Sequence, residues 1–366
     1  MITIYKNYYG DLFFKLKNNT EFREILDLIK KIPKRYIYFF SEVKNEYYYM
    51  NNIGELYILK GKKESNILKT FSNFYPENDL IYSILKLTNK FLIPFTVFDL
   101  ANFYKKGYKI RYLKQNEKVI SLYILKNNIV EFVFFDVENI NLMIQTLNDI
   151  ASFVEDEYII NVYSNQQNFK NFLLNKNFLA EKEFFIHRLD GYGIHITTPE
   201  KNDSNNMMEF YENVLKNTST LATQLDEFDK TKKDIEKIID ISKKLFGIRI
   251  LIAKYEKKII GNCDIYWNIQ RKRLERTAKL GISVLENFRN IGIGTMLINN
   301  HIVWCIENPK IHRLELEVFS NNPKAISLYE KLGFTIEGKR KEAAFINYKY
   351  YDILFMGYIT EPKNLF

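Results

Sequence analysis

Hydrophobic and polar positions in the second half of the chain alternate with a period of two in several segments. Leu314, Leu316 and Val318 alternate with Glu315 and Glu317, which is the pattern of a strand with one buried face. Segments with strand character extend from the region of residue 194 to the end of the chain. We expect strands over residues 194–197, 248–256, 257–267, 278–285, 313–320, 334–346 and 350–359.

Other segments of the same half show the helical period instead. Ala325, Leu328, Tyr329 and Leu332 recur at helical intervals, and Asn322, which is followed by proline, is a typical N-cap. We expect helices over residues 207–217, 230–247, 292–308 and 321–334. Strands that alternate with helices in this way indicate an α/β domain.

Between the strand over residues 278–285 and the helix that follows, the sequence reads NFRNIGIGTML. Gly292 and Gly294 lie two apart at the start of the helix, in a chain with only 14 glycines. Glycine weakens a helix by about 1 kcal/mol relative to alanine, so these two positions need another reason. Arg289, Gly292 and Gly294 form an R-x-x-G-x-G turn whose backbone amides and one cation suit a pyrophosphate. By itself the pattern is weak, because a tight, closely packed turn uses the same residues.

The first half contains a weak sequence repeat of the second half. Residues 159–189 parallel residues 315–345 at a constant offset of 156, and residues 131–136 parallel residues 281–286 at an offset of 150. The copy is therefore six residues shorter in the region that holds the glycine turn. We place a domain boundary near residue 190, which gives domains over residues 1–189 and 190–366, with the repeat clearest in residues 108–189. Residues 1–100 show mixed helix and strand character without an interpretable motif.

Composition and charge exclude some classes of protein. No apolar run approaches the length of about 20 residues that a membrane helix needs, and the first residues lack the pattern of a signal peptide. Cys263 and Cys305 are expected to be buried thiols, and the four histidines suggest no metal site. The net charge of +9 suggests nucleic-acid binding as a hypothesis. The basic residues are scattered, however, except in the run at residues 271–276. We expect a cytoplasmic protein with no membrane, nucleic-acid or metal partner.

The order of these motifs resembles the GNAT superfamily of acetyl-CoA-dependent N-acetyltransferases over residues 192–360. The resemblance rests on ISVLENF, the R-x-x-G-x-G turn, LELEVFSNN, PKAISLYEKLGF and EGKRKEA, which occur in the order and at the spacing of the family. It is closest to the ribosomal-protein-alanine and small-amine branches. It implies a central, mixed and mostly antiparallel twisted sheet flanked by helices, and the first domain looks like a degenerate half of the same fold.

The resemblance also implies how acetyl-CoA binds. Backbone groups of residues 282–284 would contact the pantetheine arm, residues 289–295 would cradle the pyrophosphate, and Asn322 would bond the pantetheine. The residues that receive a cofactor role in this way are Ile282, Ser283, Val284, Arg289, Asn290, Ile291, Gly292, Ile293, Gly294, Thr295, Asn322 and Tyr329. Because the copy in the first domain lacks this turn, we expect that domain to bind no acetyl-CoA and to be catalytically inactive.

Two residues match the catalytic groups of the family. Tyr329 matches the tyrosine that protonates the departing thiolate, although its place on the apolar helix face also suits a core residue. Glu317 matches the glutamate that accepts the amine's proton, but Glu315 shares its face, and both carboxylates could simply face solvent. Close relatives often carry a histidine and a glutamate on the preceding strand, where this chain has Arg276 and Lys279. That departure suggests an acceptor pocket with a different charge.

The acceptor site of the family usually lies between its first two helices. Asp226, Glu227 and Asp229 lie in that segment and could attract a cationic amine, although such a charge run is more often a solvated loop. We therefore expect an N-acetyltransferase that transfers acetyl from acetyl-CoA to a primary amine by direct attack in a ternary complex. The alternative is a non-catalytic acyl-CoA-binding module. The acceptor is either a small molecule or a protein N-terminus, and a homodimer is left open.

Overall fold

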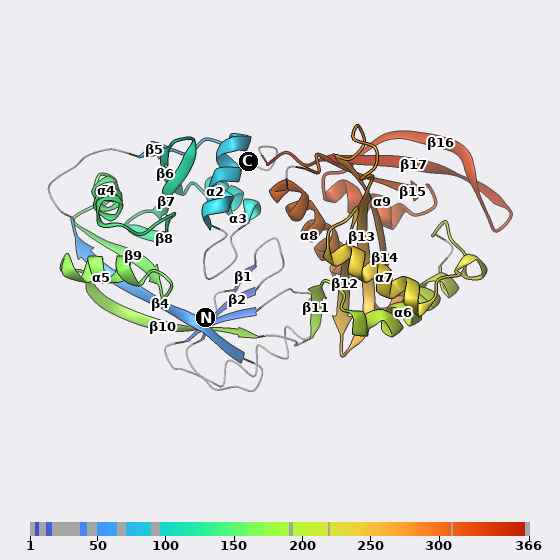
Figure 1. Cartoon of the computed structure of the whole chain (residues 1–366), viewed down its shortest axis with the longest axis horizontal. Coiled ribbons are helices and arrows are strands. Elements are labelled where there is room, and N and C mark those ends of the chain that lie inside the picture. Colours follow the sequence, from blue (N-terminus) through green and yellow to red (C-terminus); the bar gives the residue numbers. More distant parts are fainter. Residues whose placement is uncertain are drawn as a thin grey trace.

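The computed structural model describes most of the chain as two halves, each built on its own sheet (Figure 1). The described residues are 4–6, 12–16, 37–41, 50–63, 71–88, 96–189, 193–218, 220–308 and 310–362. All strands up to residue 189 belong to a ten-stranded sheet, and all strands from residue 194 onward belong to a seven-stranded sheet. The proposed domain boundary thus falls between the two sheets, and residues 190–192 lie outside the described residues.

The second half has each strand and helix expected from the sequence, with ends shifted by a few residues, and its strands form the seven-stranded sheet. Its strands are β11 (Ile194–Thr197), β12 (Ile248–Tyr255), β13 (Lys258–Trp267), β14 (Thr277–Val284), β15 (Arg313–Phe319), β16 (Thr335–Ile346) and β17 (Lys349–Ile359). Its helices are α6 (Ser204–Lys216), α7 (Lys232–Lys243), α8 (Ile293–Glu307) and α9 (Pro323–Lys331). The strand order is β11-β12-β13-β14-β15-β17-β16. Only the β14–β15 pair is parallel, so the sheet is mixed and mostly antiparallel, as expected.

The ten-stranded sheet carries helices as well. Its strands are β1 (Ile4–Lys6), β2 (Leu12–Leu16), β3 (Ile37–Ser41), β4 (Met50–Lys62), β5 (Ser72–Asn73), β6 (Lys109–Gln115), β7 (Lys118–Lys126), β8 (Ile129–Phe135), β9 (Glu157–Tyr163) and β10 (Leu179–Leu189). Its helices are α2 (Asn78–Thr88), α3 (Val97–Lys105), α4 (Ile140–Ala151) and α5 (Gln167–Asn175). Seven of the strands run in the order β10-β4-β9-β8-β7-β6-β5.

This order repeats that of the second sheet strand for strand. Only the β8–β9 pair among these seven strands is parallel, as the β14–β15 pair is in the second sheet. The offset of 156 relates the bounds of β9 to those of β15 and the bounds of α5 to those of α9. The strand β4, however, comes before the others in sequence, whereas β17, which holds the same place, comes last.

The parallel pair diverges in both sheets. Pairing of β14 with β15 covers Thr277 to Lys279 and stops there, although both strands continue beyond this point. Pairing of β8 with β9 covers only Ile129 and Val130. One edge of β14 therefore leaves the ladder and opens toward the helices above it.

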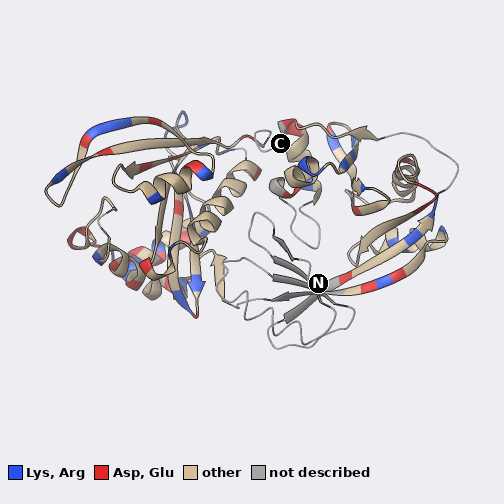
Figure 2. Cartoon of the chain, turned by 180° about the vertical axis from the view of Figure 1, so that it is seen from behind, with Lys and Arg blue, Asp and Glu red and all other residues tan. Residues whose placement is uncertain are grey.

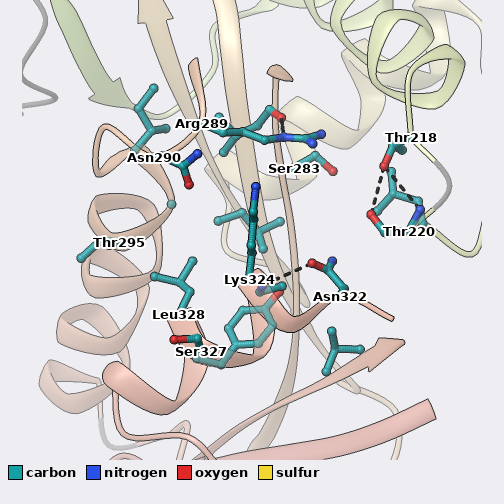
Figure 3. Close-up of a pocket in the computed structure, with 18 of the residues that line it drawn as sticks. Thr218, Thr220, Ser283, Arg289, Asn290, Thr295, Asn322, Lys324, Ser327 and Leu328 are labelled. Atoms are coloured by element: carbon teal, nitrogen blue, oxygen red, sulfur yellow. Dashed lines mark hydrogen bonds between the residues drawn. The ribbon is translucent and has the colours of Figure 1, made fainter. Parts of the chain in front are cut away.

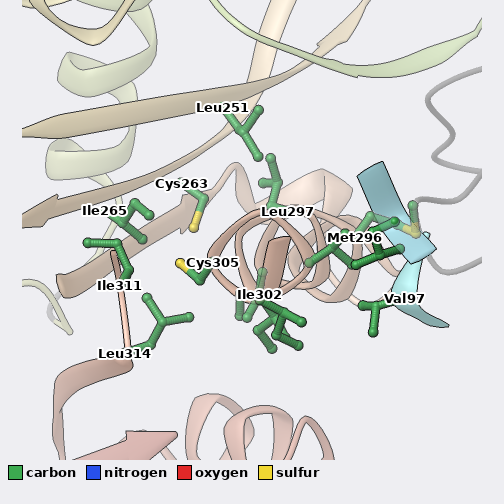
Figure 4. Close-up of a cluster of buried hydrophobic side chains, with 14 of the residues drawn as sticks. Val97, Leu251, Cys263, Ile265, Met296, Leu297, Ile302, Cys305, Ile311 and Leu314 are labelled. Carbon is green, nitrogen blue, oxygen red and sulfur yellow. The ribbon is translucent and has the colours of Figure 1, made fainter. Parts of the chain in front are cut away.

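The helix α8 is buried on nearly all sides. Met296 and Ile302 lie in a hydrophobic cluster that also contains Val97 of α3, and Figure 4 shows Val97 beside them. The opposite face of α8 packs on the seven-stranded sheet, where Cys305 lies near Cys263 of β13. Both thiols are free and buried, as expected from the sequence. The first half thus covers the helix whose N-terminus carries the glycine turn.

Charges of both signs are interspersed along the described elements (Figure 2). The hairpin of β16 and β17 carries three basic residues in succession, Lys339, Arg340 and Lys341. Lys339 pairs with Asp352 across the hairpin. None of the helices in the described ranges is long and apolar enough to cross a bilayer.

The contact between α3 and α8 generates a stability prediction. Val97→Ala removes two methyl groups from a fully buried side chain, so we expect a loss of about 1–3 kcal/mol in the free energy of unfolding. Urea unfolding followed by circular dichroism measures this loss. Lys105→Ala, at the exposed end of the same helix, serves as the control and should unfold with the wild type. Equal midpoints for Val97→Ala and the wild type would contradict a packed contact here.

Candidate functional site

A cleft of about 890 Å³ opens where β14 leaves β15. The strand β14, the turn before α8, the start of α9 and the segment after α6 form its walls (Figure 3). Lining residues from β14, β15 and the turn include Gly281, Ile282, Ser283, Val284, Arg289, Asn290, Gly292, Ile293, Gly294, Thr295 and Glu317. Lining residues from α9 and the segment after α6 include Asn217, Thr218, Thr220, Leu221, Asn322, Lys324, Ser327, Leu328 and Tyr329.

The turn before α8 leaves backbone amides available at the mouth of the cleft. Asn290 has φ of 65° and Gly292 has φ of 92°, so two residues of the turn are left-handed. Gly292 is also the N-cap of α8 and makes no side-chain capping bond. The first amides of the helix are therefore not capped by its own N-cap residue, and the helix dipole adds positive potential there.

The second glycine of the turn has a different physical reason. A Cβ on Gly294 would lie 3.1 Å from Leu328 Cδ2 and 3.7 Å from Ile282 Cδ1. The first distance is tighter than an ordinary van der Waals contact, so a side chain here would require the Leu328 side chain to shift. Gly292 is thus required by backbone conformation, and Gly294 by close packing of the helix against the cleft wall.

Arg289 is held against the strand that lines the cleft. Its Nε donates to the carbonyl oxygen of Val284 at 3.0 Å. This bond fixes the guanidinium beside the turn, and it also means that the Val284 carbonyl already has a partner within the protein. Figure 3 shows the guanidinium extending along the cleft near Ser283.

The start of α9 contributes one expected and one unexpected residue. Asn322 Oδ1 accepts a hydrogen bond from the Ala325 amide at 3.3 Å, which confirms it as the N-cap of α9. Lys324, in the first turn of α9, projects into the cleft toward Asn290 and Arg289 (Figure 3). The sequence analysis did not assign Lys324, and its place two residues after the N-cap was the only available signal. Two cations thus lie near the glycine turn.

Tyr329 lies on α9 at the inner end of the cleft. Its side chain is buried and packs against Phe334, with ring centroids 6.0 Å apart. Burial raises the pKa of its hydroxyl group above the usual value, so the residue stays protonated at neutral pH. Tyr329 is therefore both a core residue and part of the cleft wall, and its role as proton donor stays a prediction.

Glu317 also lines the cleft, from β15. Its carboxylate pairs with Arg340 Nη2 at 2.8 Å and with Lys279 Nζ at 3.6 Å. Lys279, one of the two strand positions singled out from the family resemblance, thus supplies a cation to this glutamate. The negative charge of Glu317 is thus balanced by two cations.

The acidic run proposed for acceptor binding lies outside the cleft lining. Asp226, Glu227 and Asp229 are exposed, and Glu227 accepts a hydrogen bond from the Gln224 amide in a short 3-10 turn. The same connection does reach the cleft, but through its earlier residues Thr218, Thr220 and Leu221. The hydroxyl groups of Thr218 and Thr220 lie 3.0 Å apart at this wall (Figure 3).

A carboxylate that the sequence analysis did not single out lies beside the cleft. Asp264 of β13 pairs in register with Gly281, and a Cβ on Gly281 would lie 3.5 Å from Asp264 Oδ1. Asn262 Nδ2 donates to the same oxygen at 3.0 Å. Burial raises the pKa of Asp264 from its usual 3.8 to about 6. One acidic residue in a strand gives no signal of this kind in sequence, because its neighbours come from other strands.

The corresponding place in the first half differs in each of these features. A hollow of only about 170 Å³ lies there, lined in part by Asp136, Glu138 and Gln166. Asn139 caps α4 by accepting from the Leu142 amide at 2.9 Å. Gln166, which corresponds to Asn322, donates from Nε2 to the Val133 carbonyl at 2.7 Å. A side-chain cap, two carboxylates and a bridging glutamine therefore replace the bare turn.

Comparison with known proteins adds independent evidence. Residues 215–334 match the acetyltransferase (GNAT) family. The L-amino acid N-acetyltransferase AaaT of Escherichia coli is 36% identical over 110 residues, which cover 30% of this chain and 67% of that protein. The spermidine N(1)-acetyltransferase of Vibrio cholerae is 32% identical over 117 residues, which cover 32% of this chain and 65% of that protein. The acetyltransferase PseH of Campylobacter jejuni is 32% identical over 122 residues, which cover 32% of this chain and 73% of that protein.

The aligned segments cover about a third of this chain and from 65% to 73% of each relative. The matched range contains β14, the glycine turn, β15 and α9, which are the elements that build the cleft. By this evidence the chain belongs to the GNAT family of acetyltransferases and is an acyltransferase whose co-substrate is acetyl-CoA.

Proposed function

We propose that the chain transfers an acetyl group from acetyl-CoA to a primary amine by direct attack in a ternary complex. The observation that carries this proposal is the uncapped, left-handed turn at the start of α8, which lies beside the diverging edge of β14. The cleft runs from this turn to Tyr329, so an anion-binding end and a proton donor share one cavity. No covalent bond to the protein is needed for such a transfer.

The residues present fit acetyl-CoA. The amides that follow Gly292, together with Arg289 and Lys324, suit the pyrophosphate, because charge-assisted hydrogen bonds contribute about 1.5–3 kcal/mol each. Ile282 and Ser283 lie on the edge of β14 that has left the ladder, and Asn322 lies opposite them across the cleft, which suits the amide groups of a pantetheine arm. When bound, the co-substrate supplies the reactive thioester.

The acceptor must reach its free-base form before it can attack. An alkyl amine with a pKa near 10.4 is protonated at pH 7, and deprotonation costs about 4.6 kcal/mol, from 3.4 units at about 1.36 kcal/mol each. A carboxylate near the thioester lowers this cost. At the other end of the reaction, the Tyr329 hydroxyl donates a proton to the departing thiolate, a role supported by its protonated state and its place in the cleft.

The acceptor class follows from this chemistry and from the relatives, whose names mention L-amino acids and spermidine. A primary amine on a small molecule or a peptide N-terminus is the common feature. The rival interpretation is a non-catalytic acyl-CoA-binding module, which would bind coenzyme A without turnover.

We also propose that the first half is a rearranged and inactive copy of the same fold. The matching strand order and the constant offset of 156 support a common origin. Where the second half has Arg289 and a glycine N-cap, the first half has the Asn139 side chain, which occupies a helix amide. The carboxylates of Asp136 and Glu138 there would repel an anion. We therefore assign acetyl-CoA binding to the second half alone.

The proposed function is tested by release of free thiol from acetyl-CoA. The purified chain is assayed with spermidine, with a set of L-amino acids and with a peptide that has a free N-terminal alanine. We expect at least one acceptor to give turnover above the hydrolysis background. Binding of coenzyme A with no thiol release from any of these amines would favour the binding module instead.

The glycine turn generates a binding prediction. Gly292→Ala places a side chain at φ of 92°, which strains the turn and displaces its amides. We expect coenzyme A affinity to fall by about tenfold or more, since one charge-assisted hydrogen bond is worth at least that factor. Isothermal titration calorimetry measures the change. Gly107→Ala is the matched control, because Gly107 also has positive φ, has no neighbour near its Cβ position, and lies in the first half. Similar losses in both variants would refute the assignment of the turn.

Tyr329 generates a kinetic prediction. Tyr329→Phe keeps the ring that packs against Phe334 and removes the proton donor, so kcat should fall by about 10²–10⁴-fold while coenzyme A affinity changes little. Steady-state assays and calorimetry on the same preparation separate the two effects. A variant that keeps the wild-type kcat would show that the hydroxyl has no part in the reaction.

A further inference from the structure

Two carboxylates flank the point where β14 leaves β15, on the same face of the sheet. Asp264 pairs in register with Gly281, and continuing the register of Lys279 with Glu315 places Gly281 opposite Glu317. Directly paired residues project to the same face of a sheet. That face is the one covered by α6 and α7, because Ile250, which pairs with Asp264, belongs to the apolar cluster under those helices.

Gly281 places no side chain between the cleft and Asp264. The glycine lines the cleft, and the nearest neighbour of a Cβ built on it is the Asp264 carboxylate. Any larger side chain at this position would fill the space between them. The two carboxylates, Asp264 and Glu317, therefore lie on either side of Gly281, which has no side chain.

The two carboxylates are not equivalent as proton acceptors. The carboxylate of Glu317 is engaged in ion pairs with Arg340 and Lys279. Asp264 instead accepts a hydrogen bond from the neutral amide of Asn262. Among the described residues, Asp264 is thus the carboxylate of the two that is not engaged by a cation, unlike the glutamate expected from the resemblance.

The neighbour of Asp264 adds an independent sign of a ligand. Asn262 is 3% exposed, and its Oδ1 is buried without a hydrogen-bond partner among the described residues. Its Nδ2 is committed to Asp264, which fixes the direction of the amide. Asn262 Oδ1 therefore lacks a donor beside a carboxylate that accepts from Asn262 Nδ2, and a buried acceptor without a donor is costly. A primary ammonium group supplies several donors and a positive charge.

We propose that Asn262 and Asp264 hold the acceptor's ammonium group beside Gly281 and that Asp264 accepts its proton, directly or through one water molecule. This inference rests on the proposed function and names the general base and the binding site of the acceptor amine for that reaction. It requires a primary amine, because an alcohol or thiol would bring one donor and no charge to the pair.

The surroundings of Asp264 suit this role. Ile250 of β12 and Gly281 of β14 flank it without charge, and Tyr211 of α6 is near enough to interact with it electrostatically. Burial raises the pKa of Tyr211 above its usual value, so it remains neutral. Cys263, the adjacent thiol, is also kept protonated by burial. With a pKa of about 6, Asp264 is mostly ionised at pH 7 and close to the operating pH that general-base catalysis favours.

The proton balance of the reaction closes with these groups. Asp264 takes one proton from the ammonium, and the freed lone pair forms the C–N bond with the thioester carbonyl carbon. The C–S bond breaks, the sulfur takes the Tyr329 proton, and the nitrogen loses a second proton to the tyrosinate through solvent. Asp264 then releases its proton to solvent, so that one amide, one thiol and one proton result.

The test is the pH profile of kcat/KM in Asp264→Asn, with the best acceptor from the panel of spermidine, L-amino acids and the alanyl peptide. We expect a loss of about 10²-fold at pH 7. The acidic limb centred near pH 6 in the wild type should disappear. The difference in kcat/KM between variant and wild type should narrow toward about pH 10, because a growing fraction of the amine is already deprotonated there. A structural role would lower the rate by the same factor at every pH.

Controls and outcomes separate the two proposals. Asp240→Asn removes the same charge from the surface of α7, where Asp240 pairs with Lys201, and should keep the wild-type profile. Gly281→Val should raise the acceptor KM, because the new side chain would lie between the cleft and Asp264. If the wild type gives turnover and Asp264→Asn keeps its rate and its acidic limb, the role of Asp264 is overturned and the proposed function stands. A wild type with no turnover overturns both.

A stability measurement shows that Asp264→Asn is folded and tests the same environment. The pKa of Asp264 is raised in the fold from 3.8 to about 6, so protonation stabilises the fold as the pH falls through 6. Above that pH the buried charge costs stability, and Asp264→Asn removes the cost. The variant should therefore melt at a higher temperature than the wild type at about pH 8, with the difference narrowing toward about pH 5. Equal differences at both pH values would contradict a desolvated carboxylate.

Discussion

The divergence of two parallel strands is the constraint on which the site depends. After Lys279 and Glu315, β14 and β15 no longer exchange backbone hydrogen bonds, although each keeps its antiparallel neighbour on the other side. Unpaired strand edges are costly unless another group satisfies them. The chain leaves this edge facing a cleft, so a ligand with amide groups and an anionic end can complete what the sheet does not. The glycine turn, the cations and the buried tyrosine are all placed relative to that opening.

The two halves show what distinguishes a competent opening from a closed one. Both sheets diverge at the same place in the fold, so divergence alone does not make a site. In the first half, the Asn139 cap and the Gln166 bridge satisfy backbone groups from within the chain. In the second half, Gly292 has no side chain that could cap the helix amides or block access to them, so these amides stay available to a ligand. A few side chains with short polar groups therefore decide whether the same framework can receive an anion.

The sequence predicted elements whose signals are local. Period-two alternation located β15, and the N-cap with its following proline located α9, because both depend on residues close together in the chain. The position of β4 was not predictable, since its partners β9 and β10 lie about a hundred residues further on and residues 1–100 carry no motif. Among candidate site residues, Glu317 reaches the cleft, but its two cations come from β14 and β16 and only the fold brings them together. The pairing of Asp264 with Gly281 is invisible for the same reason.

The early place of β4 in the chain has a consequence for synthesis. It is an interior strand, hydrogen-bonded on both sides, yet both neighbours leave the ribosome long after it. Both edges of this long strand stay open until β9 has emerged, and one edge stays open until β10 is complete at residue 189. An open strand edge is a template for intermolecular association. The second half avoids this exposure, because β17 is made last and finds β15 and β16 already present. Chaperone demand during translation is therefore concentrated in the first half, although the chemistry belongs to the second.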